Sequence, residues 1–570
     1  MPSKSRRSFI KDAATSILSE KEKIPVVEFI DPSNKTIPRH LAKTSTGISE
    51  YTGTFTDAHI LHLLRRTMFG VTPEDLAFFK TKSMQEAVNY LLVVPTTPPA
   101  PPVNNYSSAQ ITDPDVPLGQ TWVNAPANPQ IEFLRRNSFK SWWTGLMLNQ
   151  ERNIREKMTL FWHNHFATES NVIQDSRYLY KHHALIRASC LGNFKTFVRE
   201  ITIDPGMLVY LNGELNIKDA PDENYARELQ ELFTVGKNLT PHYTEADVKA
   251  AARVLTGWKT NRVGISSTFN ASLHDTGNKQ FSSFYNNTLI TGRSGATAGN
   301  LELDDLLNMI FAHQEVAKSI CREIYRYFIY YIIDENVELN VIEPLATFFR
   351  NNNYDIKKLM EKLLKSEHFF DPLNMGCLIK QPMDQLIGSS RLMGLTFPSA
   401  TNTQQQYGHW QFIQQFGILT GQDLCDPPNV AGWPAFHQDP QYYELWINSD
   451  SLPKRNLFND LMIYVGFNRF GFNLKYNVIA FAERLSDPSN PNTLINDITK
   501  LGYPVDISTT SKNAIKTSIL LSGQTSDHYW TDAWNTYKNN PSDPIAKNGV
   551  EIRLQALLKH FFGLAEYQLS

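Results

Sequence analysis

Cysteine is scarce in this 570-residue chain, and long apolar runs are missing from it. The cysteines are Cys190, Cys321, Cys377 and Cys425, and none belongs to a C-x-x-C pair, which argues against a thiolate zinc site. One or two disulfides are the alternative to isolated buried thiols. No apolar run reaches the roughly 18 residues that a membrane-spanning helix needs, so the sequence predicts no membrane span.

Common catalytic signatures are also missing. The chain contains no G-x-x-x-x-G-K-[ST], G-x-G-x-x-G, H-E-x-x-H or G-x-S-x-G motif. This argues against nucleotide hydrolysis, dinucleotide redox chemistry, zincin proteolysis and the α/β-hydrolase triad. The formal net charge of -2 gives no overall attraction to nucleic acid, so we expect none as a partner.

Aromatic side chains are plentiful, with 33 Phe, 23 Tyr and 10 Trp. Such a supply suits either large buried cores or surfaces that stack on carbohydrate, and composition does not separate the two. Hydrophobic residues make up 41% and charged residues 20%, which is an ordinary globular mixture.

The N-terminal region, residues 1–50, carries no sustained periodicity. Residues 5–11 read Ser-Arg-Arg-Ser-Phe-Ile-Lys and resemble a twin-arginine export motif. The following apolar stretch, 12–18, is short, and no clear cleavage site follows it. We predict an export-signal-like tail and a periplasmic or extracellular protein. The alternative is a basic, disordered tail on a cytoplasmic protein.

The rest of the chain, residues 51–570, is dominated by helical patterns. Residues 222–235 show an apolar stripe that stops at Gly236, and residues 244–255 begin with a capping-box pair and stop before Gly257. The sequence therefore predicts a mainly α fold: one large multi-helix globular unit with long irregular loops and at most a small β-hairpin.

Two segments interrupt the helical pattern. Residues 95–130 are rich in proline and predict a long exposed loop, since the run 95–102 cannot be helical. Residues 258–300 are rich in Ser, Thr, Asn and Gly and predict a loop-rich insertion, with residues 281–290 as a short hairpin. Long loops of this kind are common places for function.

Several segments together are distinctive and occur in order along the chain. They are LLRRTMFG at 63–70, KMTLFWHNHF at 157–166, NYARELQELF at 224–233, AARVLTGW at 251–258, HDTGNK at 274–279, PPNVAGWP at 427–434 and the pair Glu566-Tyr567. In these segments the chain resembles the bacterial family known as domain of unknown function 1800. The resemblance implies a helical and frequently exported protein, often encoded near a second family that looks like phosphatases and sulfatases. It implies no particular activity.

The first candidate site is the pair His163 and His165. On a helix, residues two apart point about 200° away from each other, but on an extended segment or past a helix end both can reach one ion. Imidazoles are common ligands of zinc, copper, iron and nickel, so we predict a divalent metal ion here. The alternative is one core histidine bonded to a carbonyl and one surface histidine.

A second candidate is the pair Glu228 and Glu231, which share one helix face three residues apart. Two carboxylates on one face can bind a divalent ion or act as a general acid and base. The alternative is a solvated salt bridge between Arg227 and Glu231.

His274 and Asp275 form a third candidate because they fall in the loop-rich insertion. We predict His274 as a metal ligand and Asp275 as a catalytic carboxylate. Alternatively, Asp275 starts a turn with Gly277.

Trp433 and Trp446 form the fourth candidate, in and after a proline-rich loop. Their rings can stack on a sugar, or they can anchor the loop to the core.

Two functional hypotheses follow. The first is a metal-dependent hydrolase in which the histidines and carboxylates converge and the metal polarises water. The second is a non-catalytic exported protein that binds a polysaccharide or a phosphatase/sulfatase-like protein. In that case, the same polar residues are caps and salt bridges spread apart in space.

Overall fold

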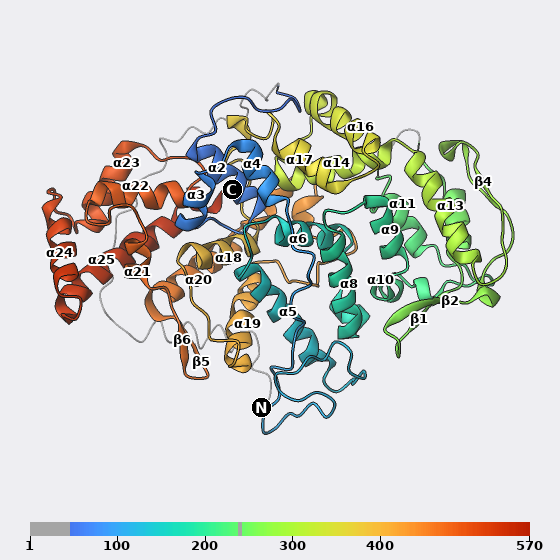
Figure 1. Ribbon diagram of the computed structural model, residues 1–570, viewed down its shortest axis with the longest axis horizontal. Helices are drawn as coiled ribbons and strands as arrows, with labels where there is room; N and C mark the ends of the chain where they lie inside the picture. The colour runs from blue at the N-terminus through green and yellow to red at the C-terminus, as the bar shows by residue number, and fades with distance from the viewer. Residues whose placement is uncertain (1–45, 238–241, 440) are drawn as a thin grey trace.

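The computed structural model describes residues 46–237, 242–439 and 441–570, and helices dominate it (Figure 1). The predicted mainly α fold is confirmed. The export-like motif and residues 1–45 as a whole lie outside the described residues. Across the described part of the chain, no helix combines the length and the hydropathy needed to cross a bilayer.

The helices of the first half are α2 (Asp57–Thr67), α3 (Pro73–Phe79), α4 (Met84–Leu91), α5 (Glu132–Leu148), α6 (Arg155–His165), α7 (Ser170–Ile173), α8 (Ser176–Ser189), α9 (Phe194–Thr202), α10 (Pro205–Tyr210), α11 (Asn224–Glu231) and α12 (Glu245–Val254). Those of the second half are α13 (Ala298–Ala312), α14 (Glu315–Phe328), α15 (Glu335–Val337), α16 (Glu343–Asn351), α17 (Ile356–Leu364), α18 (Pro382–Leu392), α19 (Thr403–Leu419), α20 (Ser451–Asp460), α21 (Val478–Glu483), α22 (Pro491–Gly502), α23 (Thr509–Ile515), α24 (His528–Asn539) and α25 (Pro544–Gly563). Short helical turns used below are η7 (Pro434–Phe436), η8 (Tyr442–Trp446) and η11 (Ala565–Gln568).

Helix starts follow the capping chemistry of the sequence. At α12, the Thr244 hydroxyl accepts from the Asp247 N–H at 3.2 Å, and Asp247 accepts in return from the Thr244 N–H at 2.7 Å. This reciprocal arrangement satisfies two backbone donors that the first turn leaves open. The helix then ends at Val254, and Gly257 has a φ of +94°, in the left-handed region that favours glycine.

Helix α11 is shorter than predicted. It ends at Glu231, and the chain turns instead of continuing to Val235. The N–H of Phe233 donates to the Glu228 carbonyl at 2.9 Å, and the Thr234 hydroxyl donates to the Leu229 carbonyl. A threonine hydroxyl that bonds to the backbone competes with the regular helical ladder, and this accounts for the early end.

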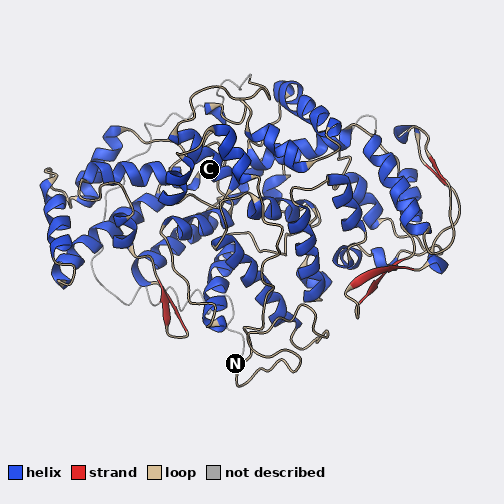
Figure 2. Ribbon diagram, in the orientation of Figure 1, coloured by secondary structure: helices blue, strands red, loops and turns tan. Residues whose placement is uncertain are grey.

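Strands are few and peripheral (Figure 2). The described residues contain three antiparallel pairs: β1 (Trp258–Asn261) with β2 (Ser266–Phe269), β3 (Lys279–Gln280) with β4 (Leu289–Ile290), and β5 (Phe467–Arg469) with β6 (Phe472–Leu474). The third pair was not predicted. Its turn places Phe470 at a φ of +52° before Gly471, whereas Asn or Asp is the usual signal in that position.

The proline-rich segment 95–130 contains no helix, but it is less exposed than predicted. Asp113 forms an ion pair of 2.9 Å with Arg135 of α5, and both side chains are fully buried. The indole of Trp122 is also buried and donates to the Ser138 hydroxyl at 3.2 Å. These polar anchors hold the loop against α5.

The two ends of the described chain meet at the centre of the molecule, where α2 lies beside the C-terminus (Figure 1). One guanidinium nitrogen of Arg65 donates to the carbonyls of Lys500, Leu501 and Tyr503 at 2.9 to 3.1 Å. Nearby, Ser570 donates its N–H to the Leu378 carbonyl at 2.8 Å. Segments that are far apart in sequence therefore enclose the same central region.

Candidate functional site: an aromatic and cationic pocket

The two predicted histidine ligands of α6 lie in separate surroundings. Because both belong to one helix, their rings point in different directions. The ring of His163 lies 5.0 Å from that of Trp143 and 5.8 Å from that of Trp433, measured between centroids. His165 packs among phenylalanines, and its Nε2 lies 3.2 Å from the Phe233 carbonyl.

Burial determines the charge of both rings. It lowers the pKa of His163 to about 3, helped by the nearby His182, and that of His165 to about 4. Removing an imidazolium from water is costly, so both rings are neutral at pH 7. The Nε2 of His163 has no hydrogen-bond partner within the described chain, and the rings of Trp143 and Trp433 pack against the imidazole.

The predicted carboxylates of α11 are held differently. Glu231 forms an ion pair of 2.7 Å with Lys237. Glu228 is half-buried, and burial together with the charge of Glu231 raises its pKa. Arg227 turns away from Glu231, to Glu223 at 3.2 Å and Glu245 at 2.7 Å.

His274 and Asp275 belong to a buried polar network in the insertion. The His274 Nε2 lies 3.1 Å from Glu302, and the ammonium of Lys279 contacts the same carboxylate at 2.6 Å. Asp275 pairs with Arg253 at 2.7 Å. These contacts tie the insertion to α12 and α13.

The structure thus does not bring the predicted metal ligands together. In residues 46–237, 242–439 and 441–570, no group of three or more His, Cys, Asp or Glu side chains is arranged to hold a metal ion. The side chains present do not fit a divalent metal site, since such sites need several converging ligands.

The loop that carries Trp433 is fixed to α6. Gly432 has a φ of +86°, and a Cβ there would collide with the side chain of Asn164 and lie 2.6 Å from its carbonyl oxygen. The Trp433 N–H donates to the Asn164 side-chain oxygen at 2.8 Å, and the ring is only 2% exposed. Trp433 therefore has no ring face open to a ligand.

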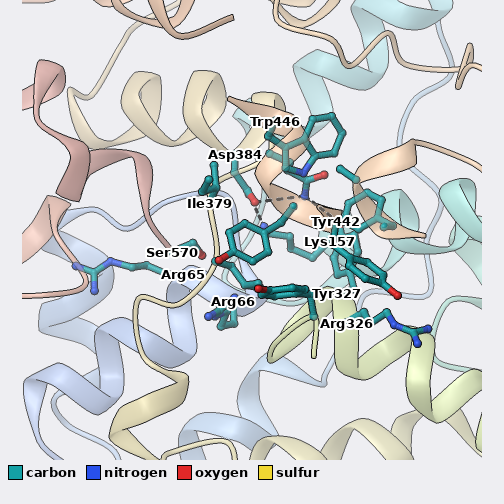
Figure 3. Close-up of a pocket in the computed structure, with 16 residues that line it drawn as sticks. Arg65, Arg66, Lys157, Arg326, Tyr327, Ile379, Asp384, Tyr442, Trp446 and Ser570 are labelled. Atoms are coloured by element: carbon teal, nitrogen blue, oxygen red, sulfur yellow. Dashed lines mark hydrogen bonds and ion pairs between the residues drawn. The ribbon is translucent and has the colours of Figure 1, made fainter. Parts of the chain in front are cut away.

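Trp446 is different because it borders a pocket. This cavity of about 30 Å³ lies between α2, α6, α14, α18 and the turns η7 and η8 (Figure 3). Its aromatic lining consists of Tyr327, Tyr331, Phe436, Tyr442, Tyr443 and Trp446. Its cationic lining consists of Arg65, Arg66, Lys157 and Arg326. We call it the aromatic–cationic pocket.

An ion pair between Lys157 and Asp384 occupies the centre of this pocket (Figure 3). Gln381 donates to Asp384 at 3.3 Å and to the Tyr327 hydroxyl at 3.0 Å. Burial lowers the pKa of Lys157, although the carboxylate of Asp384 opposes that shift. Asp384 is the one acidic side chain among the residues that line the cavity.

Three arginines contribute to the walls of the pocket. Arg65 and Arg326 reach outward on opposite sides, so their stems border the cavity and their charges flank it (Figure 3). Burial, with a contribution from Arg66, lowers the pKa of Arg65 to about 9. Arg66 donates to the Asn374 carbonyl at 3.1 Å, but its Nε–H has no acceptor in the described part of the chain.

Two further basic side chains lie behind the pocket. The ammonium of Lys380 sits 3.8 Å from the ring centroid of Tyr567, and Arg455 donates to the Lys380 carbonyl at 2.9 Å. Burial lowers the pKa of Lys380 well below its usual range, and the charges of Arg65, Arg455 and Lys157 add to the shift.

Sequence reasoning selected Trp446 but missed Arg65, Arg66, Lys157 and Asp384. The first three lie inside the distinctive segments 63–70 and 157–166, and all three are buried. The presence of charged residues within these distinctive segments was the available signal, because charged side chains are rarely buried unless they are paired. Asp384 carried no such signal.

Comparison with known proteins gives one match. The family described as protein of unknown function (DUF1800) matches residues 62–569, nearly the whole chain. No curated protein and no solved structure matches the chain.

Proposed function

We propose, from the premise that this chain belongs to the DUF1800 family, that it is an exported, non-catalytic protein that binds a polysaccharide in the aromatic–cationic pocket. One observation carries the proposal: aromatic rings and polar groups line a single cavity, whereas the predicted metal ligands stay apart. Export rests on the twin-arginine-like residues 5–11.

The chemistry of the lining suits a sugar. Aromatic faces pack against the C–H faces of sugar rings, and charged or amide side chains bond to hydroxyls and fix the orientation of the ligand. The turn η8 supplies the half-buried rings of Tyr442 and Tyr443, and Gln381 and Asp384 supply polar atoms to the same lining. No activated nucleophile or acid–base pair of the described chain is needed for this role.

Binding of an exported phosphatase- or sulfatase-like protein is the second candidate from the sequence. The small volume of the cavity, about 30 Å³, favours a narrow ligand over a protein surface, because protein interfaces bury about 800 Å² per partner.

The test is a binding screen of the full chain against an array of neutral and acidic glycans, with tryptophan fluorescence as a second readout. We expect binding of at least one glycan with a Kd below 1 mM, and loss of that binding in Tyr443→Ala. The matched control is Tyr529→Ala, an exposed tyrosine of α24 outside this pocket. Binding to no glycan on the array would overturn the proposal.

A parallel measurement addresses the metal-dependent hydrolase. The protein is purified without chelator, and its metal content is measured by mass spectrometry beside His163→Ala/His165→Ala. We expect no stoichiometric metal in the wild type. A stoichiometric metal that disappears in the double variant would favour the metal-dependent hydrolase over the non-catalytic binding protein.

A further inference from the structure

We propose that the ligand of the aromatic–cationic pocket is anionic: a saccharide whose carboxylate or sulfate group enters the cavity while its ring rests on the aromatic mouth. This inference rests on the proposed function and names its ligand class. It is carried by three observations: the charge balance of the pocket, an unpaired buried donor, and the size of the cavity.

The side chains that line the cavity are positive in balance. Four of them are cationic, against the carboxylate of Asp384, which pairs with Lys157, while Arg326 pairs with Glu323. The same carboxylate also acts on the buried basic side chains of Lys380 and Arg455 behind the wall. Charges of one sign around a narrow, low-dielectric cavity focus their field into it and attract the opposite charge.

An unpaired donor lies at the cavity. Arg66 is 4% exposed, and its Nε–H has no acceptor in the described part of the chain. A buried donor without a partner is available to an acceptor on a bound group. Arginine is the side chain best suited to carboxylate and sulfate-like oxyanions, because its planar group donates in a fixed fork.

The size of the cavity selects the part of the ligand that enters. A volume of about 30 Å³ is enough for one or two water-sized groups but not for a sugar ring. A carboxylate or sulfate group that projects from a ring matches this size. The ring itself then lies outside, against Tyr442 and Tyr443, which are half-buried.

Arg326 provides the sharpest test because it lines the pocket and has a close counterpart outside it. Its side chain is 23% exposed and pairs with Glu323 at 3.1 Å. Arg322, one turn earlier on α14, is 25% exposed and pairs with Glu338, yet it does not line the pocket. Arg326→Gln and Arg322→Gln therefore remove the same charge at the same exposure.

The experiment measures Kd by calorimetry for oligomers of polygalacturonate, sulfated dextran and unsubstituted dextran, on the full chain and both variants. We expect at least tenfold tighter binding of one acidic oligomer than of dextran. Arg326→Gln should weaken that binding at least fivefold, and Arg322→Gln less than twofold. Raising NaCl from 50 to 500 mM should weaken the acidic oligomer alone, because salt screens charge attraction.

The outcomes separate the two proposals. Preference for polygalacturonate assigns a carboxylate, preference for sulfated dextran assigns a sulfate, and either supports the inference. Equal binding of dextran and the acidic oligomers, or equal effects of the two arginine variants, would overturn the anionic ligand and leave polysaccharide binding in place. Binding of none of the three oligomers, together with an empty glycan array, would overturn both.

Discussion

Aromatic rings surround both the α6 histidines and the aromatic–cationic pocket. The histidines are neutral, whereas the pocket contains paired charges. Around His163, rings of Trp143 and Trp433 exclude water, and burial lowers the histidine pKa so that no charge remains. In the pocket, aromatic rings surround Lys157, which is paired with Asp384. A buried ionisable group stays charged where a counter-charge or several carbonyls meet it, and is neutral where they do not.

This difference shows why a ligand-like residue type is a weak guide to a site. His163 and His165 are residue types that commonly bind metals, but aromatic rings pack against both of them. Lys157 and Arg66 are not typical metal ligands, but they line a cavity. Substitutions in both regions test this difference.

The largest effect is expected at the loop that joins the two regions. Gly432→Ala should lower the free energy of unfolding by about 3–5 kcal/mol, because a left-handed φ and a collision with Asn164 add together. Gly421→Ala is the matched control, with a φ of +99° and no atom within 4 Å of the added carbon. It should cost about 1–2 kcal/mol. Urea unfolding measures both, and equal costs would contradict the close contact with α6.

A smaller effect is expected from the network around His274. Lys279→Met removes the ammonium group that pairs with the buried carboxylate of Glu302. We expect it to lower the free energy of unfolding by about 3 kcal/mol. Lys237→Met removes the partner of Glu231, but Lys237 is 52% exposed, and the cost should stay below about 1 kcal/mol. Thermal unfolding of the two variants compares them. Similar losses of stability in the two variants would contradict a stabilising role for the buried ion pair between Lys279 and Glu302.

The smallest effect is a pH dependence of stability. His163 has a usual pKa of 6.5 and a folded pKa of about 3, so below pH 6.5 the unfolded chain binds a proton that the folded protein does not. Stability is therefore lost as pH falls through this window, by up to about 1.4 kcal/mol per pH unit, or about 2 kcal/mol between pH 6.5 and 5.

The variant His163→Gln should remove that part of the slope. The control is His528→Gln, which removes a histidine at an exposed position. Urea unfolding at pH 5, 6 and 7 measures the slopes. An unchanged slope in His163→Gln would show that this ring is accessible to protons in the folded protein.

Much of the fold follows from local patterns in the sequence. Capping pairs such as Thr244 with Asp247, and a glycine such as Gly257 after the last turn, are short-range signals. The early end of α11 and the pair β5–β6 escaped prediction because a hydroxyl at Thr234 and a positive φ at Phe470 act against the usual preferences. Both differences from the predicted secondary structure are confined to short segments.

The site could not be predicted in the same way, because it is assembled from distant segments. Arg66, Lys157 and Asp384 are separated by tens to hundreds of residues, and each alone resembles an ordinary surface charge. Only packing places them around one cavity. Trp446 was selected for its residue type, and its place in the pocket depends on the turn η8.

The bonds of Arg65 have a consequence for the order of events during synthesis. This side chain belongs to the first described helix, yet the carbonyls that receive its hydrogen bonds lie at Lys500, Leu501 and Tyr503. A ribosome that adds about 5–20 residues per second needs roughly 20–90 seconds to make the intervening chain. Throughout that time the guanidinium of Arg65 on α2 lacks the carbonyl groups that accept its hydrogen bonds. A nascent chain that stalls before residue 500 therefore lacks the acceptors that fix Arg65, one of the residues that line the pocket.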